Sequence, residues 1–215
     1  MNIAFLGDST EEKRFLMLCL AKIASGHTKV RIISKQPYSF DDIDETYEYC
    51  GIEIIHIKDG GDPLLKLSAE ASNFIDAEEF IDIPKGFKVV AISETTRNRL
   101  ESCVKLAGEY TWFKPSIKVF IIYLNIMEYC KIGKRYLDCF WERSLPSFTE
   151  ITGVSEIYFE EKNHTAMIES QYSNNLSVKK LSVPFRTALR TIIQNIFSMD
   201  TKEAKAIIKK AERMK

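Results

Sequence analysis

The first fifteen residues constrain the fold more than any other stretch of the chain. An apolar run from Ile3 to Leu6 ends in Gly7, and a helix-like pattern begins within a few residues. This order is typical of a strand, a tight turn and a helix N-terminus, which form the first β-α unit of an open parallel sheet. Ligands of such sheets lie beyond the carboxyl ends of the strands, often at a helix N-terminus. The candidate site of this chain therefore begins at Gly7.

The same stretch has the frame of a phosphate-binding loop, G-x-x-x-x-G-K-[ST], with two substitutions. Gly7 and Lys13 are in the expected positions, but Glu12 replaces the second glycine and Arg14 replaces the serine or threonine. The second glycine lets backbone N–H groups surround a phosphate, and the hydroxyl binds Mg²⁺. The carboxylate of Glu12 would oppose a phosphate a few Å away by about 1 to 4 kcal/mol. A guanidinium cannot ligate a cation.

An ordinary capped helix accounts for the same residues, and we favour it. The stretch from Ser9 to Glu12 fits a capping box, with Ser9 at the N-cap and Glu12 at the third helical position. Glu11 and Glu12 would also favour the positive end of the helix dipole. On this interpretation the protein's own carboxylates fill the anion site.

Composition excludes several classes of protein. Of 215 residues, 45% are apolar and 28% are charged, as in soluble globular proteins. Lys plus Arg and Asp plus Glu both number 30, and this balance argues against bulk nucleic-acid binding. No signal peptide or membrane-length apolar run is apparent. The five cysteines are scattered, so we expect reduced thiols in a cytoplasmic protein without a metal site.

Strand-like and helix-like segments alternate along the chain. Beyond the first unit, we expect strands at Lys29–Ser34, Ile52–Ile57, Phe87–Ser93, Lys118–Asn125 and Ser155–Phe159, and helices at Glu11–Ala24, Ser39–Tyr49, Leu64–Ala71, Thr95–Tyr110, Glu128–Arg143, Leu181–Ser198 and Thr201–Lys215. Residues 73–86 fit either a short edge strand or a surface loop, and residues 146–153 fit a loop. The most apolar strand, 118–125, is expected to be central.

This alternation predicts an α/β fold of three layers, in which a doubly wound and mainly parallel sheet has helices on both faces. Residues 1–200 are expected to form one domain, and residues 201–215 a C-terminal amphipathic helix.

The order and spacing of the elements resemble the ParA/MinD family of P-loop ATPases, which includes the pilus-positioning proteins called CpaE or TadZ. The loop of that family is K-G-G-x-G-K-[ST]. Asp8 stands where its first lysine would be, Glu12 at the last glycine and Arg14 at the Mg²⁺ ligand, so that only Lys13 is kept. Asn125 ends a strand that resembles the one whose asparagine contacts the adenine base.

Two further elements of the family are partly present. Its second strand ends as I-D-x-D-P, whereas Ile33–Pro37 keeps the first and last residues and loses both acids. Its D-x-P element, with the Walker-B acid, resembles Ile81–Pro84. The phosphate, metal and catalytic residues of the family are therefore mostly replaced. A Rossmann dinucleotide domain fits less well, because no second glycine follows Gly7 until Gly26.

Three functions follow from these residues. The first is a non-catalytic, pseudo-ATPase relative that acts through a protein partner or as a homodimer, as a cytoplasmic scaffold or regulator in positioning or assembling a surface apparatus. It has no catalytic residue and no cofactor. The second is a switch that binds ATP and Mg²⁺ through altered ligands, with Lys13, Arg14 and Lys35 on the phosphates and Asn125 on the base. The third is an enzyme of another class that uses the polar groups at the strand ends, Ser9, Ser34, Ser93 or Glu94.

The C-terminal helix carries a narrow apolar stripe of Ala204, Ile207, Ile208 and Ala211 among six basic residues. MinD proteins carry a C-terminal amphipathic helix that lies on membranes. The stripe here buries little apolar area and has no Trp or Phe to anchor it. A helix docked on its own domain or on a partner is therefore favoured over a membrane surface.

Overall fold

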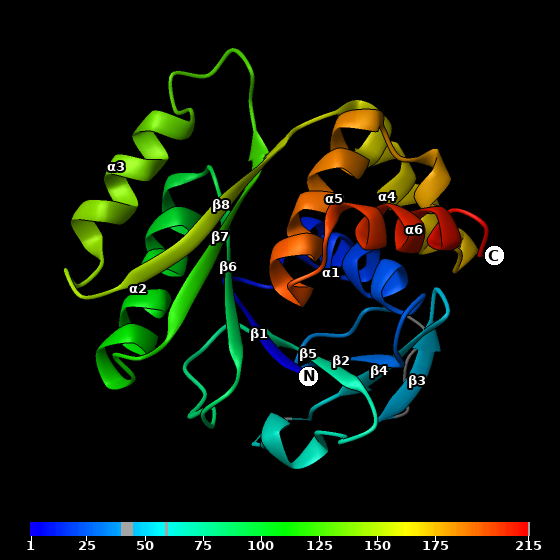
Figure 1. The fold of residues 1–215 in the computed structure, drawn as a ribbon, viewed down its shortest axis with the longest axis horizontal. Coiled ribbons are helices and arrows are strands. Elements are labelled where there is room, and N and C mark those ends of the chain that lie inside the picture. Colours follow the sequence, from blue (N-terminus) through cyan, green and yellow to red (C-terminus); the bar gives the residue numbers. More distant parts are fainter. Residues whose placement is uncertain (40–44, 59, 215) are drawn as a thin grey trace.

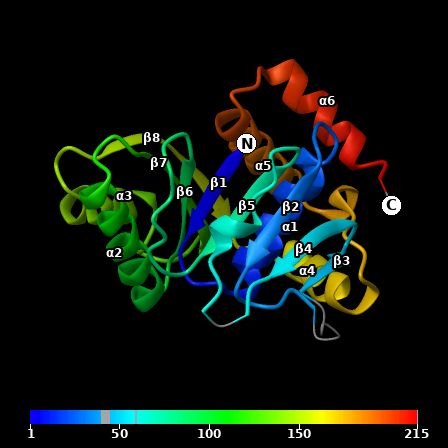
Figure 2. The same cartoon turned by 90° about the horizontal axis from the view of Figure 1, so that it is seen from below.

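The computed structural model describes residues 1–39, 45–58 and 60–214. Its strands form one eight-stranded sheet in the order β3-β4-β2-β5-β1-β6-β7-β8. The strands are β1 (Asn2–Leu6), β2 (Val30–Ser34), β3 (Thr46–Tyr49), β4 (Ile52–His56), β5 (Ser72–Ala77), β6 (Lys88–Glu94), β7 (Lys118–Ile126) and β8 (Glu150–Tyr158). Every neighbouring pair is parallel except β3 and β4. Figure 2 shows this order, with β8 on the left and β3 on the right.

Helices cover both faces of the sheet, as predicted. They are α1 (Glu11–Ala24), α2 (Arg97–Phe113), α3 (Lys134–Ser144), α4 (Glu161–Ser173), α5 (Val183–Phe197) and α6 (Thr201–Ala211), with the 3₁₀ turns η1 (Pro63–Lys66) and η2 (Val178–Lys180). Helices α2 and α3 lie on one face, and α1, α4, α5 and α6 lie on the other (Figure 1). The predicted three-layer α/β fold is therefore confirmed.

Strand β1 belongs to two hydrophobic cores at once. Ile3 and Phe5 are in the core under α1 and α5, whereas Ala4 and Leu6 are in the core under α2 and α3. This division follows from the two-residue repeat of a strand, whose side chains alternate between faces. A strand that is buried on both faces has a continuous run of apolar residues, and such a run predicts the first strand from the sequence.

Strand β5 is the largest error of the sequence prediction. Residues 72–77 are neither an edge strand nor a loop, because β5 lies between β2 and β1 and all its residues are buried. Asn73 and Asp76 interrupt its apolar pattern. The Asn73 amide is satisfied inside the protein, since it donates to the Asn2 side chain at 2.7 Å and to the Ser68 carbonyl at 2.8 Å. Partners from distant segments therefore make a polar central strand stable.

The helix predicted at Ser39–Tyr49 is wrong for the described residues, and residues 40–44 lie outside them. Thr46–Tyr49 is β3, which forms an antiparallel hairpin with β4. Tyr49 pairs with Ile52, and the two residues between them, Cys50 and Gly51, have φ values of 52° and 76°. Two consecutive positive φ angles are typical of a type I′ hairpin turn. The usual sequence signal for this turn is Asn-Gly. Cys50 stands in the place of the asparagine, so the turn was not predicted.

Two strands on the other side of the sheet also differ from the prediction. Strand β7 is not at the centre of the sheet but next to the edge strand β8. Strand β8 is longer than the strand predicted at Ser155–Phe159, because it begins at Glu150, inside the predicted loop. Its first five residues are all exposed or half-buried, so no apolar run marks them. It needs few apolar residues because an edge strand is only half covered.

Three helical segments were also misjudged. The predicted helix at 64–71 is only the 3₁₀ turn η1, the helix predicted from Glu128 begins at Lys134, and α4 was not predicted. Helix α4 has few buried residues, among them Met167, so its periodic signal is weak.

Helix α6 packs on the rest of the chain. Its buried residues, Ala204, Ile208 and Ala211, face α1 and α5. The Asp200 side chain caps its N-terminus. None of the helices in the described part of the chain is long and apolar enough to cross a membrane.

Candidate functional site at the carboxyl edge of the sheet

The loop between β1 and α1 contains only residues 7–10, because the helix begins at Glu11. Gly7 has a φ of 120°, and a Cβ at this position would lie 2.5 Å from the Ile92 carbonyl oxygen. Its N–H donates to the Ala77 carbonyl at 3.1 Å. Glycine is therefore required here by the close approach of β6, whether or not a ligand binds.

The capping box predicted at Ser9 and Glu12 is wrong. The N-cap of α1 is Thr10, whose Oγ1 accepts the Lys13 N–H at 3.2 Å. The Thr10 hydroxyl in turn donates to the Glu94 carboxylate at the end of β6. Ser9 cannot cap the helix because its hydroxyl is used elsewhere, 2.5 Å from Asp76 Oδ2.

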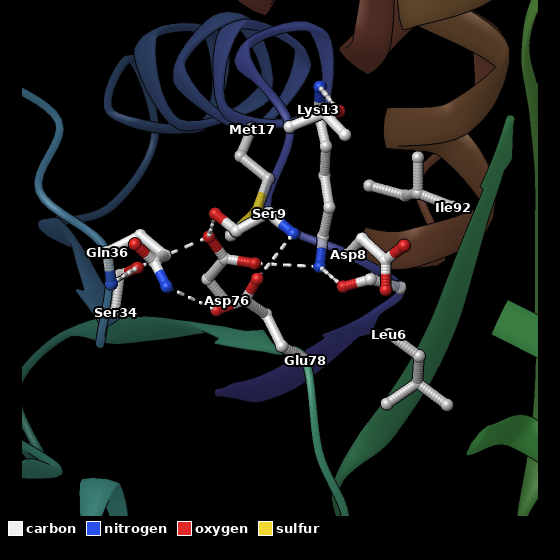
Figure 3. Close-up of polar contacts among 12 residues, drawn as sticks. Leu6, Asp8, Ser9, Lys13, Met17, Ser34, Gln36, Asp76, Glu78 and Ile92 are labelled. Atoms are coloured by element: carbon white, nitrogen blue, oxygen red, sulfur yellow. Dashed lines mark hydrogen bonds and ion pairs between the residues drawn. The ribbon is translucent and has the colours of Figure 1, made fainter. Parts of the chain in front are cut away.

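Lys13 lies at the centre of the edge and is buried. Its Nζ is 2.7 Å from Asp76 Oδ1 and 2.5 Å from the Gly7 carbonyl oxygen. The side chains of Lys13 and Asp76 are 1% and 0% exposed. Figure 3 shows the lysine reaching from α1 to the carboxylate on β5. A charged pair so deeply buried is stable only when further hydrogen bonds complete it.

Three hydroxyls complete the pair on the side of Asp76. Oδ2 accepts from Ser9 at 2.5 Å, from Ser34 at 3.2 Å and from Tyr38 at 3.4 Å. Burial, and then the nearby Asp76 carboxylate, raise the pKa of Tyr38, which keeps its phenol protonated as a donor. Asp76 thus joins the ends of β1, β2 and β5.

Asp76 was missed in the sequence. The signal was the short apolar run Phe74–Ile75 followed by an acid, within a stretch that we could not assign. The acid proposed instead, Asp82, points to the surface and pairs with Lys114 at 2.6 Å.

A carboxylate does lie on the backbone of the loop, and it belongs to Glu78. The Ser9 N–H donates to Glu78 Oε1 at 2.9 Å, and Gln36 donates to its Oε2 at 3.0 Å. Glu12 is a half-buried residue in the first turn of α1. The acid on the loop therefore comes from the segment after β5 rather than from the helix.

The other predicted site residues are dispersed. Asp8 is held by Arg99 at 2.6 Å and by Ser102 at 2.8 Å. The Arg14 backbone N–H donates to the Thr10 carbonyl at 2.9 Å, but its guanidinium has no hydrogen bond or ion pair among the described residues. Lys35 pairs with Glu79 on the surface. Asn125, at φ 58°, lies where β7 loses its register with β8, and its carbonyl accepts from Thr95 at 3.2 Å.

Comparisons with known proteins give the fold but no sequence family. No family model matches the chain, and no curated protein matches it in sequence. Among solved structures, the MinD cell division protein of Aquifex aeolicus has a TM-score of 0.59 and 13% identity, covering 93% of this chain and 98% of that one. A ParA family ATPase from Chlorobium tepidum has a TM-score of 0.56 and 10% identity, covering 98% and 96%. The chain has the ParA/MinD fold.

Two small cavities lie near Asn125 and Arg14, the candidate contacts predicted from the sequence for a base and a phosphate. A cavity of about 30 Å³ lies between Asn125, Glu12 and the aromatic residues Phe15 and Phe159. A second, of about 140 Å³, lies between Arg14 and Tyr38. Small-molecule pockets usually measure about 300–1,000 Å³, so neither holds a nucleotide without movement of its walls.

The strand-end residues offer no nucleophilic arrangement. The hydroxyls of Ser9 and Ser34 both donate to Asp76. Ser93 is buried, and Glu94 binds Thr10. Burial, helped by Glu12 and Asp8, raises the pKa of Glu94 against the opposing effects of the Thr10 hydroxyl and Arg99. Within the described residues, no group of three or more His, Cys, Asp or Glu side chains could hold a metal ion.

Proposed function

We propose that this chain is a non-catalytic pseudo-ATPase of ParA/MinD fold, a cytoplasmic scaffold or regulator that acts through protein contacts in positioning or assembling a surface apparatus. The observation that carries the proposal is the closed pair of Lys13 and Asp76. The lysine that a phosphate-binding loop directs at its ligand is here bound to a buried carboxylate.

The lysine would have to leave this pair to bind a phosphate. Breaking a buried pair by removing one partner costs about 3–5 kcal/mol. A nucleotide would have to supply that free energy before any net affinity appeared, and 4 kcal/mol corresponds to roughly a thousandfold in Kd. The pair therefore argues against nucleotide binding independently of the missing loop glycine.

The carboxylate that would bind a metal ion already has partners within the protein. P-loop NTPases hold Mg²⁺ through the loop Ser or Thr and a Walker-B Asp. We infer that Asp76, the penultimate residue of the strand next to β1, has the place of the Walker-B acid, and Arg14 has that of the hydroxyl. Both Asp76 oxygens already have donors from the protein, so the cation would meet a guanidinium and an occupied carboxylate.

The second candidate is the nucleotide-binding switch with altered ligands. It is favoured by one observation, the guanidinium of Arg14, which lies beside a cavity and has no partner among the described residues. Arginine without a carboxylate partner binds phosphate readily. On this alternative Arg14 would make the first contact and Lys13 would be released from Asp76.

Titration calorimetry with ATP and Mg²⁺ tests both candidates. We expect no heat of binding by the wild-type protein, and none by the variant Glu12→Gly/Arg14→Thr, because that change leaves the Lys13–Asp76 pair closed. Micromolar binding with turnover would overturn the pseudo-ATPase proposal. If wild-type binding disappeared in Arg14→Gln but persisted in the exposed control Lys131→Gln, the switch would be supported instead.

A basic groove between α5 and α6 supports the protein-contact part of the proposal. It has a volume of about 520 Å³, and its lining includes four cations without an ion pair among the described residues, Arg190, Lys202, Lys205 and Lys209. Glu212 is the acid of this lining and pairs with Arg186 at 2.8 Å. A partner with an acidic surface would fit, since complementary charge sets specificity and association rate.

Sedimentation equilibrium tests whether that partner is a second copy of the chain. A wild-type dimer that is lost in the charge-reversed variant Lys202→Glu/Lys205→Glu/Lys209→Glu would identify the partner as a second copy, whose acidic surface lies outside this groove. A monomeric wild type would favour a different, acidic partner protein. Equal dimerisation of the two proteins would exclude the groove as the contact.

A further inference from the structure

A cavity of about 810 Å³ opens at the amino edge of the sheet, at the opposite end of the strands from Lys13 and Asp76. It is formed by residues 84–90 and 113–120, which lead into β6 and β7, and by the C-terminal end of α5. Its volume is in the range of small-molecule sites, about 300–1,000 Å³. Ligands of open α/β sheets usually bind at the carboxyl edge, so this cavity is separate from the site described above.

The wall of the cavity is apolar where it reaches the sheet. Val90 and Phe120 lie on neighbouring strands, and Ile196 ends the facing helix. All three belong to the hydrophobic core of that face and also line the cavity. These three side chains are 1%, 6% and 2% exposed, so they form an apolar floor beneath the cavity. Such a floor favours an apolar body.

The rim, in contrast, is cationic. Four lysines line the cavity, Lys85, Lys88, Lys114 and Lys118, and the lining contains no Asp or Glu. Lys114 and Lys118 are neutralised by acids outside the lining, Asp82 and Glu150. The rim therefore combines two neutralised lysines with two that have no carboxylate partner among the described residues.

Those two lysines are the polar feature that selects a ligand. Lys88 Nζ is positioned by the Ile196 carbonyl at 2.5 Å and by the Ser198 hydroxyl at 3.1 Å, both neutral acceptors. Lys85 has no hydrogen bond or ion pair among the described residues. Burial lowers the pKa of Lys88, as expected for an ammonium that lacks a counter-ion. An anionic group beside Lys88 would meet an ammonium that has only neutral partners, with a second unpaired lysine, Lys85, in the same lining.

We propose that this cavity binds an amphipathic anion, with its carboxylate or phosphate at Lys85 and Lys88 and its apolar body over Val90 and Phe120. Charge-assisted hydrogen bonds to the head group fix the orientation of the ligand, and burial of its apolar body supplies most of the affinity. A cationic amphiphile of equal length is excluded by the lysines, and a free inorganic anion lacks the apolar body.

Titration calorimetry with dodecanoate, dodecyl phosphate, dodecyltrimethylammonium and inorganic phosphate tests the site on the full chain. We expect the two anionic amphiphiles to bind, and the tighter of the two identifies the head group. Neither the cationic amphiphile nor phosphate alone should bind. Failure of both anionic amphiphiles, or equal binding of the cationic one, would overturn the proposal.

Two variants locate the ligand. Lys85→Gln/Lys88→Gln should weaken binding roughly tenfold or more, since each tenfold corresponds to about 1.4 kcal/mol. The exposed lysine variant Lys105→Gln/Lys131→Gln removes the same charge elsewhere and should have no effect. An affinity that does not change in the first variant would overturn the head-group assignment.

Asn195→Trp places a bulky side chain in the cavity from the exposed surface of α5 and should abolish binding. Thr191→Trp, one turn earlier on the same exposed surface and outside the cavity, is its control. Binding that survives in Asn195→Trp would show that the amphiphile lies elsewhere. This variant leaves the lysines intact, so it decides the question even if the lysine variant fails to fold.

Discussion

Replacing Asp76 with alanine is expected to destabilise the fold by about 3–5 kcal/mol, the cost of leaving one member of a buried ion pair without the other. Lys13 and Asp76 are 1% and 0% exposed, so water cannot take the place of the missing carboxylate. In the variant, the ammonium keeps only the Gly7 carbonyl as an acceptor. The hydroxyl groups of Ser9 and Ser34 also lose theirs.

The reverse change, Lys13→Met, should cost less. The Asp76 carboxylate would keep its three hydroxyl donors, and each hydrogen bond to a charged group contributes about 1.5–3 kcal/mol. The double variant Lys13→Met/Asp76→Ala should lose less free energy of unfolding than the two single variants lose together, because it leaves no buried charge. Such coupling between contacting residues is typically about 0.5–3 kcal/mol.

Urea unfolding followed by circular dichroism gives the free energy of unfolding of all three variants. The m value, which is the slope of that free energy against urea concentration, should be the same in each. In thermal unfolding, Asp76→Ala should lower the Tm by roughly 6–20 °C, at about 2–4 °C per kcal/mol for a chain of this length. Glu150→Ala is the control, since it breaks an ion pair with Lys118 whose side chains are both 58% exposed, and it should cost at most about 1 kcal/mol. A loss below about 1 kcal/mol in Asp76→Ala, or strict additivity in the double variant, would refute the reasoning.

Four further outcomes are expected. Thr10→Ala should lower the free energy of unfolding by about 1 kcal/mol as a lost N-cap; an unchanged urea midpoint would contradict the assignment. Burial raises the pKa of Glu94, so the stability linked to its protonated form is present below its ordinary pKa and lost as the pH rises through the raised value. Glu94→Gln should therefore raise the urea midpoint near pH 7 and change it little near pH 4, whereas equal shifts at both would argue otherwise. Ile208→Ala should cost about 2–5 kcal/mol because α6 is docked, and anionic vesicles should not sediment the wild type; vesicle binding lost on deleting 201–215 would favour a membrane role. A thiol reagent should label Cys130 and Cys139 in the native protein and all five cysteines after unfolding.

The sequence predicts an element correctly where its local residue pattern agrees with its tertiary environment. Strands β1, β6 and β7 are buried on both faces, so their apolar runs predict them, and the alternation of strands with helices predicts the α/β class. Strand β5 escaped because its polar residues are stabilised by partners far away in the sequence. Asn73 bonds to Asn2, and Asp76 to Lys13.

At the candidate site, too, local patterns predict the local elements but not the contacts between distant segments. Residues 7–14 form the loop and helix start as expected, because a strand that ends in glycine is a local signal. The residue that caps the helix was misplaced by one position, because Ser9 and Thr10 are both residue types that cap helices and serine is the more favoured of the two. Only the carboxylates at 76 and 94 decide between them, since they bind Ser9 and Thr10 respectively. No spacing rule could have anticipated contacts across 67 and 84 residues.

In nucleotide switches, contacts to the terminal phosphate and its Mg²⁺ order the surrounding loops, and hydrolysis releases them. In this chain the corresponding order is built in, because Asp76 ties together the ends of three strands with groups that never dissociate from the polypeptide. The surface formed by these loops would have a single form rather than two. If the chain is the pseudo-ATPase proposed above, nucleotide hydrolysis does not time its action. Synthesis and degradation would then decide when it acts, and the molecules that recognise this fixed surface would decide where it acts.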